Sequence, residues 1–349
     1  MNRHAIVLAL LAAATFGAGV PLAKALLGAV DPWMLAGLLY LGAGAGLVLF
    51  RAVRGTRVET PLRRSDLPRL LVVVIAGGLL GPLLLMSGLA RTDAATASLV
   101  LNVEAIATML IAWLVLKEPV DRRLLIGALA IIGGAVTLAW TGPGTLDAGA
   151  LLVGAACLCW GVDNTVSRQL GHADPVAVAT VKGLVAGAAN LALGWGAGAA
   201  LPAPGVAVLG LAVGAVAYGA SLVLYLRAMR DLGAARTAAY FSAAPFVGAA
   251  IAVVALGEPV TGRLVAAGVL MGIGLWLHVI EHHEHPHHHP GLEHEHGHVH
   301  DEHHRHVHAA DDPPGEPHSH PHRHEPLTHM HPHAPDLHHR HDHGGERST

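Results

Sequence analysis

Apolar stretches of about twenty residues recur along the first 280 residues, and short polar segments separate them. A helix needs about 20 apolar residues to cross the hydrocarbon core of a bilayer. Because charges rarely interrupt these stretches, the pattern predicts transmembrane helices and an all-α integral membrane fold. Ten spans are expected, at residues 5–27, 33–50, 67–88, 94–116, 123–141, 147–167, 175–199, 205–226, 234–256 and 263–280.

The composition excludes an ordinary soluble domain. The chain of 349 residues is 52% hydrophobic and 13% charged, and its mean hydropathy is +0.48. Such a chain cannot hide its apolar surface in a soluble core. The two cysteines, Cys157 and Cys159, lie inside one apolar stretch and give no disulfide framework.

The fourth and ninth spans contain an internal duplication. Residues 94–124 match residues 234–264 when 140 is added to each number, and the copies agree at ten of 31 positions without a gap. The matches cluster in a Glu-Pro-Val-x-x-Arg-Leu segment, which begins at Glu118 in the first copy and at Glu258 in the second. A repeat that includes whole spans indicates that the chain is built from two related halves.

Lysines and arginines gather in alternate loops. The loop after the second span is rich in arginine, whereas residues 201–205, the corresponding loop of the second half, carry no charge. Since basic residues favour the cytoplasmic side, both termini are expected in the cytoplasm of a plasma (inner) membrane. Residues 1–145 and 146–280 each contain five spans, so the second repeat is expected to be inverted, which places a site between the halves near the midplane.

Two short motifs accompany the repeat. Leu101–Ala105 has the sequence Leu-Asn-Val-Glu-Ala, and Ser242–Pro245 has the sequence Ser-Ala-Ala-Pro. Together with five-plus-five helices and a Lys-Glu-Pro or Gly-Glu-Pro segment that closes the fourth span of each half, these motifs resemble the EamA domain of the drug/metabolite transporter superfamily. The first copy departs from the family in having Ala105 where a proline is common. The resemblance covers residues 5–280 and implies secondary transport, most often export, of substrates that include amino acids, metabolites, drugs and metals.

The polar side chains deep within the expected spans form the candidate transport pathway. Glu104 stands mid-span, where a charge costs about 2.5–3.5 kcal/mol on insertion scales. It either relays protons, contacts substrate or forms a structural hydrogen bond with a neighbouring helix. Lys182 can pair with Glu104 or with Asp163, and the sequence does not choose between them. Asn102 and Asn164 complete the candidate set.

A weaker pattern suggests a metal ligand inside the bundle. Cys159 and Asp163 lie four residues apart on one helical face, and with Asn164 they offer soft and hard ligands to a divalent metal. The alternative is that Cys159 is a small residue of a membrane helix with no further role. Glu118 and Glu258 each precede a proline at a span end, which favours a role in ending the helix rather than in binding.

Residues 281–349 form a tail rich in histidine, proline and acidic residues, a composition that predicts disorder. All but three of the chain's 28 histidines lie in this tail. Neutral imidazole binds Ni²⁺, Co²⁺, Zn²⁺ and Cu²⁺, and binding strengthens as imidazoles lose their protons above about pH 6.5. The tail therefore predicts divalent-metal binding, and no other cofactor is required. The candidate ligands are His282, His283, His285, His287, His288, His289, His294, His296, His298, His300, His303, His304, His306 and His308.

These features predict a secondary active transporter rather than an enzyme. The first hypothesis is proton-coupled efflux of a divalent transition metal, Ni²⁺ or Co²⁺ before Zn²⁺, with the tail gathering metal beside the inner mouth. The alternative is an exporter of an amino acid or small metabolite whose tail only senses or buffers metal, and a membrane-tethered metal store is a third possibility. The expected partners are the lipid bilayer and the transported ion or small molecule, with no nucleic acid. A homodimer is left open.

Overall fold

The computed structural model describes residues 3–55, 60–117, 120 and 122–279, and four short segments of the tail. Contacts divide the chain into two units, Met1–Val279 and Ile280–Thr349. The described segments of the second unit form two antiparallel strand pairs. They are β3 (Pro286–His289) with β6 (Leu327–Met330), and β4 (Glu293–His298) with β5 (His318–Arg323).

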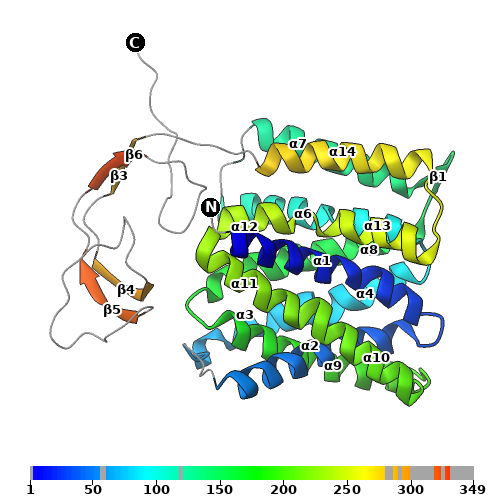
Figure 1. The fold of residues 1–349 in the computed structure, drawn as a ribbon, viewed down its shortest axis with the longest axis horizontal. Helices are drawn as coiled ribbons and strands as arrows, with labels where there is room; N and C mark the ends of the chain where they lie inside the picture. Colours follow the sequence, from blue (N-terminus) through cyan, green and yellow to red (C-terminus); the bar gives the residue numbers. More distant parts are fainter. Residues whose placement is uncertain are drawn as a thin grey trace, which may run out of the picture. The chain divides into compact units, whose positions relative to one another are not determined.

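The described part of the first unit contains ten helical spans (Figure 1). Nine of them are long and apolar enough to cross a membrane, and the tenth, Gly262–His278, is apolar but shorter. The chain is therefore a multi-pass helical membrane protein, which confirms the predicted fold class. In chain order the elements are α1 (Arg3–Leu26), α2 (Pro32–Arg54), η1 (Arg64–Asp66), α3 (Leu67–Val73), η2 (Val74–Leu80), α4 (Gly81–Leu89), α5 (Ala94–Val100), α6 (Val103–Ile111), η3 (Ala112–Leu116), α7 (Arg122–Ala139), β1 (Trp140–Gly142), β2 (Thr145–Leu146), α8 (Ala148–Ser167), η4 (Arg168–Leu170), α9 (Pro175–Gly196), α10 (Pro204–Gly214), η5 (Ala215–Ala220), α11 (Ser221–Leu232), α12 (Ala234–Phe241), α13 (Ala244–Leu256) and α14 (Gly262–Val279).

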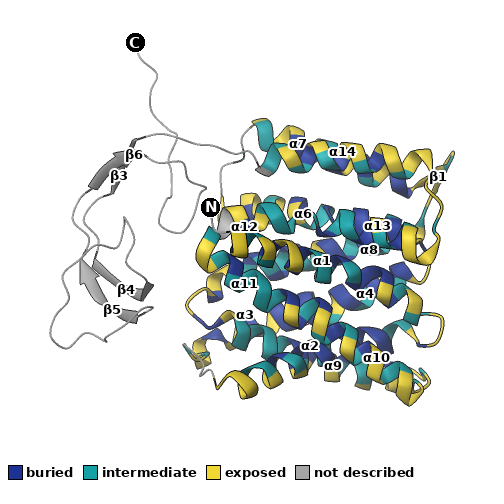
Figure 2. Cartoon of the chain, viewed as in Figure 1, coloured by how far each residue is buried: buried dark blue, intermediate teal, exposed yellow. Residues whose placement is uncertain are grey.

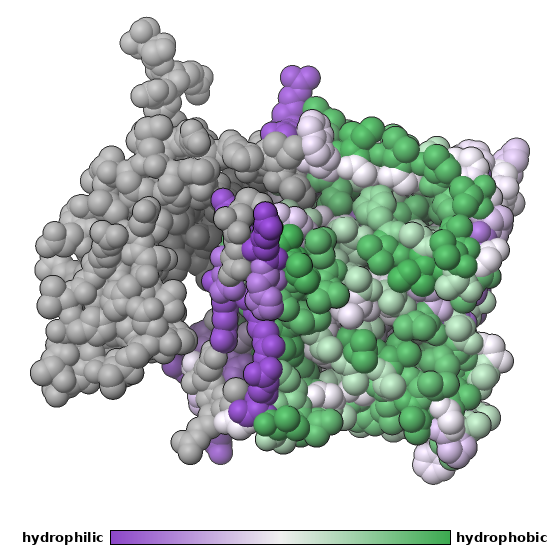
Figure 3. Space-filling model, viewed as in Figure 1, coloured by the Kyte–Doolittle hydropathy of each residue, from purple (hydrophilic) through white to green (hydrophobic). Residues whose placement is uncertain are grey.

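Apolar side chains cover the outer face of the bundle. Figure 3 shows a broad hydrophobic face, with hydrophilic residues gathered along the edge near the start of α1. Large apolar side chains such as Leu114 and Val254 are 69% and 85% exposed, and Figure 2 shows exposed residues along the outer sides of α7 and α14. Exposure of this kind suits contact with lipid chains, which are as apolar as leucine.

The eighth span continues beyond its expected end. The hydrophobic pattern places that end at residue 226, whereas α11 continues to Leu232. Its last turns carry Arg227, Arg230 and Asp231, which end the apolar stretch without ending the helix. Hydropathy follows the thickness of the bilayer, and helical hydrogen bonding does not stop at that boundary.

The fourth and ninth spans are each broken near the middle, at related positions. Turns at Leu101–Asn102 and Ser242–Ala243 separate α5 from α6 and α12 from α13. In the ninth span, Pro245 stands in the first turn of α13 and cannot continue a helix from α12 because it has no N–H. In the fourth span, the Asn102 side chain donates to the carbonyl oxygen of Leu99 at 2.8 Å, which competes with regular helical bonding.

The third and eighth spans each contain a π-helical segment, η2 and η5, again at related positions. Pro82 follows η2 and provides no N–H for the carbonyl of Gly78 four residues earlier. The Asn190 side chain donates to this carbonyl at 3.3 Å. The Gly77 carbonyl accepts hydrogen bonds from Tyr40 Oη at 2.7 Å and from Trp160 Nε1 at 3.0 Å. Side chains of α2, α8 and α9 therefore hold η2 in place, and π-helical turns are frequent at functional sites.

The two repeats pack into each other through small residues. Gly17 of α1 lies against the backbone of Ala244 and Gly248 in α13, and Gly161 of α8 lies against the backbone of Ala107 in α6. In each case the first span of one repeat contacts the second part of the broken span of the other repeat. Added Cβ atoms at these glycines would overlap the neighbouring backbone, so close approach requires glycine there.

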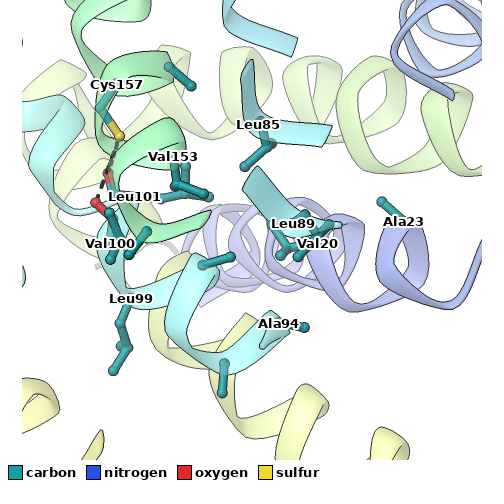
Figure 4. Close-up of a cluster of buried hydrophobic side chains, with 14 of the residues drawn as sticks. Val20, Ala23, Leu85, Leu89, Ala94, Leu99, Val100, Leu101, Val153 and Cys157 are labelled. Atoms are coloured by element: carbon teal, nitrogen blue, oxygen red, sulfur yellow. Dashed lines mark hydrogen bonds between the residues drawn. The ribbon is translucent and has the colours of Figure 1, made fainter. Parts of the chain in front are cut away.

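A buried apolar cluster joins α1, α4, α5 and α8 around the break in the fourth span (Figure 4). The Cys157 thiol lies 3.7 Å from the Val100 carbonyl oxygen and 4.0 Å from that of Leu101. Cys157 therefore offers a weak S–H donor to carbonyls beside the break. This gives Cys157 a packing role in the apolar core.

Candidate transport pathway

Glu104 lies in the first turn of α6, directly after the break in the fourth span. Its Oε1 accepts a hydrogen bond of 2.9 Å from Asn164 Nδ2 in α8. The same amide donates to Thr108 Oγ1 at 3.2 Å. The N-terminus of a helix favours a negative charge, so the break lets the fold hold a carboxylate at mid-span. Glu104 of the first repeat is thus joined to the second repeat through one amide.

Lys182 pairs with Asp163, one of the two partners that the sequence allows. Lys182 Nζ in α9 lies 2.7 Å from Asp163 Oδ2 in α8, and Ser167 Oγ donates to Asp163 Oδ1 at 3.0 Å. The Asp163 side chain is 3% exposed and the Lys182 side chain is 23% exposed. Asp163 directly precedes Asn164 in α8, and the Asn164 amide bonds to Glu104. The pair therefore lies next to the Glu104 contact along α8, and Lys182 remains partly accessible.

The pair rests on two glycines of η2. An added Cβ at Gly77 would overlap the Asp163 carboxylate and lie 2.6 Å from Asp163 Cβ, and one at Gly78 would lie 3.1 Å from Lys182 Cγ. The sequence signal for this contact is the pair Gly77–Gly78 in an apolar span, which packing alone also explains. Glycine at position 77 leaves the space that the Asp163 carboxylate occupies.

We expect Gly77→Ala to displace the Asp163 carboxylate from Lys182. The free energy of unfolding should fall by about 1–3 kcal/mol, the usual cost of overpacking. The measurement is thermal unfolding in detergent. Gly133→Ala in α7 is the control, because an added Cβ there meets nothing within 4 Å and alanine favours a helix. Equal shifts for the two variants would show that Gly77 does not hold the pair.

Six aromatic rings form a continuous arc beside these polar groups. Trp160 Nε1 lies 3.4 Å from Tyr40 Oη, and ring contacts with centroids 5.1–5.9 Å apart continue the arc. In order, the members are Trp160, Tyr40, Tyr218, Phe16, Phe241 and Tyr225. The chain has six Trp, four Tyr and four Phe, so this arc holds six of its 14 aromatic residues.

The arc was not predicted from the sequence. Its members come from α1, α2, α8, η5, α11 and α12, and no motif joins them. The one available signal is that Phe16 and Trp160 are each followed by glycine in the first spans of the two repeats. Tyr40 links the arc to the acidic groups, since its hydroxyl donates to the Gly77 carbonyl oxygen and Gly77 lies against the Asp163 carboxylate.

Two other predicted site residues, Asn102 and Cys159, have different surroundings. Asn102, in the break, donates to the Leu99 carbonyl oxygen of α5 and lies against Met271 in α14, with Nδ2 3.8 Å from the sulfur. Cys159 is partly exposed. Within the described residues no three or more His, Cys, Asp and Glu side chains gather as a metal site, so the metal role of Cys159 stays a prediction.

The side chains of the predicted tail ligands lie outside what the structure describes. Some of these histidines lie in β3 and β4, for which the structure describes only the backbone. The others, from His282 to His308, lie outside the described residues. Metal binding by the tail therefore stays a prediction from composition.

Comparisons with known proteins give one family. The model of the EamA-like transporter family matches residues 3–140 and 147–280, well over half of the chain. The chain is 29% identical over 282 residues to an uncharacterized transporter of Methanothermobacter thermautotrophicus, covering 75% of this chain and 82% of that protein. It is 33% identical over 192 residues to an uncharacterized protein of Pseudomonas aeruginosa, covering 54% and 66%. A crystal structure of a protein at 21% identity has a TM-score of 0.58 and covers 78% of this chain and 95% of that chain, which shows likeness of fold.

Proposed function

Because the chain belongs to the EamA-like transporter family, we propose that it is a proton-coupled secondary transporter of the drug/metabolite transporter superfamily. The observation that carries this proposal is the Glu104–Asn164 contact beside the Asp163–Lys182 pair. A carboxylate in the middle of a membrane span is costly, and such residues commonly serve proton or ion pathways. We assign Glu104 as the proton-binding group.

The proton step uses groups that the contacts bring together. Asp163 and Lys182 neutralise each other, so Glu104 is the acidic group of this centre whose contact is a neutral amide. When Glu104 binds a proton, Asn164 can still hydrogen-bond to it through the amide, and the mid-span charge is removed. Substrate and proton then alternate at the same place, which couples their movement in opposite directions.

We propose that the protein exports its substrate across a plasma membrane, with both termini in the cytoplasm. The orientation rests on the arginine-rich loop after α2 and on the uncharged loop between α9 and α10. Figure 3 shows hydrophilic residues along one edge of the bundle, as expected where a membrane protein meets water. A cysteine in the second loop, at Ala203, should react with an impermeant reagent added from outside.

For the substrate, we propose a divalent transition metal, Ni²⁺ or Co²⁺ before Zn²⁺. The support is the sequence of the tail, whose many histidines raise the local metal concentration on the side where export begins. Binding depends on neutral imidazole, so it weakens below about pH 6.

Truncation after Glu281 is expected to raise the apparent KM for Ni²⁺ and to leave the maximal rate within about twofold, since the tail affects supply rather than the pathway. The measurement is Ni²⁺ flux into everted vesicles over a range of concentrations. A control tail of the same length, with glutamine in place of histidine, should behave like the truncation. Superimposable curves for the full-length protein and both variants would show that the tail has no role in transport. The main support for a metal substrate would then be lost.

A second candidate substrate is an amino acid or small metabolite. The aromatic arc favours it, because ring faces bind apolar groups and organic cations and offer few ligands to a transition metal. Labelled phenylalanine is a suitable probe, and its flux into everted vesicles is measured with and without Ni²⁺. Phenylalanine flux that Ni²⁺ does not change would favour this candidate and leave the tail as a metal buffer.

A further inference from the structure

Glu258 binds across the two repeats. The sequence favours only a role in ending the helix, but α13 ends at Leu256 with Gly257 in the left-handed conformation (φ 69°). The Glu258 carboxylate instead accepts hydrogen bonds from the backbone N–H groups of Ala94 and Ala95, at 2.7 Å each. Ala94 and Ala95 begin α5, the first half of the broken span that carries Glu104. The sequence does not predict this contact, because backbone N–H groups are present at every residue except proline.

This contact closes a seam between α5 and α13. Below it, Ser98 of α5 faces Gly248 of α13, where an added Cβ would lie 2.8 Å from Ser98 Oγ and 2.7 Å from the Gly17 carbonyl oxygen. Ser98 is 1% exposed, and its hydroxyl is buried without a hydrogen-bond partner. The seam is thus tight but held by van der Waals contact at Ser98, whereas Glu258 supplies two charge-assisted hydrogen bonds at its end.

Other contacts gather at the same end of the bundle. Lys24 Nζ donates to the carbonyl oxygens of Leu89 and Thr92, at 2.7 Å each. Arg263 donates to the Leu138 carbonyl oxygen at 2.6 Å. These bonds use backbone acceptors at the end of α4, just before α5 and in α7. Glu258 differs from them because its carboxylate joins the broken span of one repeat to the broken span of the other.

We propose that Glu258 is the latch of an outer gate, and that its release from α5 is required for the site to open to the outside. The proposal rests on the transport function and on the membrane orientation argued above. Opening separates α5 from α13 along the seam at Ser98, and α5 leads directly to the break before Glu104. Glu258 is therefore a positioning residue for the pathway, and it touches neither substrate nor proton.

Ser98→Cys reports the state of this seam. The reporter is placed in a background in which Cys157 and Cys159 are replaced by serine, and its reaction rate with an impermeant maleimide is measured in right-side-out vesicles. Glu258→Gln is expected to raise this rate by about tenfold or more, because the amide oxygen can accept from only one of the two N–H groups, without a charge, while the amide NH2 faces the other donor. Glu258→Asp should give an intermediate rate, since it keeps the charge on a shorter side chain.

The matched control is Asp31→Asn. Asp31 caps α2 at the same end and accepts a bond of 2.8 Å from Trp33 N within its own helix, so its variant should leave the Ser98→Cys rate within about twofold of the unmodified background. Ala203→Cys should label fully in every variant, which shows that the reagent and the fold are intact. If Ala203→Cys labels only in inside-out vesicles, the orientation is wrong, and the same comparison of rates is made there.

Two results overturn the latch. The first is a maleimide reaction rate of Ser98→Cys that is the same with and without Glu258→Gln, which would make the contact a simple helix cap. The second is an equal rise of this rate with Asp31→Asn, which would mean that the substitution destabilises this end of the bundle in general. Labelling needs no substrate, so a failure of the proposed proton coupling appears in flux measurements and leaves this test unaffected.

Discussion

Replacing Glu104 with glutamine is expected to abolish the pH dependence of transport while leaving the fold intact. Glutamine keeps the shape of the side chain and an oxygen that can accept from Asn164, but it cannot bind a proton. A rate limited by one titrating group changes by up to about tenfold per pH unit. We expect the transport rate of the variant to change by less than about twofold per pH unit. Its flux driven by a pH gradient should fall by at least about tenfold relative to wild type. The measurement is flux in proteoliposomes under an imposed pH gradient.

The control for this variant is Asp31→Asn, the same chemical change at a carboxylate that caps α2. It should retain both the rate and the pH response. Wild-type flux with an unchanged pH profile in Glu104→Gln would make the carboxylate structural. The hydrogen bond to Asn164 would then be its whole role.

Removing one member of the Asp163–Lys182 pair is expected to have the largest effect on stability. Lys182→Met leaves the Asp163 carboxylate, 3% exposed, without its partner, and breaking a buried pair costs about 3–5 kcal/mol. The double variant Asp163→Asn, Lys182→Met removes both charges and should recover most of that loss. Thermal unfolding in detergent and the yield of folded protein measure the difference.

Transport separates a structural pair from a functional one. If the pair only supports the fold, the double variant should transport at close to the wild-type rate. If Lys182 also contacts substrate, stability should return without transport. A double variant as unstable as Lys182→Met would contradict the pairing itself.

The span pattern predicted most of the fold. Each helix that crosses the membrane needs about 20 apolar residues, and the ten expected spans correspond to the ten observed. Local composition is sufficient for this, because the bilayer imposes one length on every span. The deep polar residues Glu104, Asp163 and Lys182 also stood out by composition alone. The structure pairs Lys182 with Asp163, and it bonds Glu104 to Asn164, the residue that follows Asp163.

The irregular parts of the spans could not be predicted from apolar patterning. The break at Asn102 and the π-helical segment η2 lie inside continuous apolar stretches. Their carbonyls are satisfied by side chains from helices far along the chain, such as Asn190 with Gly78. Only the packed bundle provides these donors, so a window of twenty residues contains no sign of them.

Contacts between the repeats were missed for the same reason. Glu258 lies in a motif that the duplication identified, but its partners Ala94 and Ala95 are backbone groups that any residue provides. The aromatic arc joins rings from both repeats, and no spacing along the sequence connects Phe16 with Tyr218 or Phe241. Such sites depend on how the helices pack, and this packing cannot be inferred from the pattern of a single sequence.

Proton movement coupled to substrate movement is the most direct test of the role of Glu104. Proteoliposomes containing Ni²⁺ and a trapped pH indicator are diluted into Ni²⁺-free buffer, and internal pH and Ni²⁺ release are recorded together, with phenylalanine as the alternative load. Coupling through Glu104 predicts that internal pH falls as substrate leaves wild-type vesicles and stays constant in vesicles with Glu104→Gln. Substrate release without a pH change in the wild type, or the same pH change in both proteins, would contradict it.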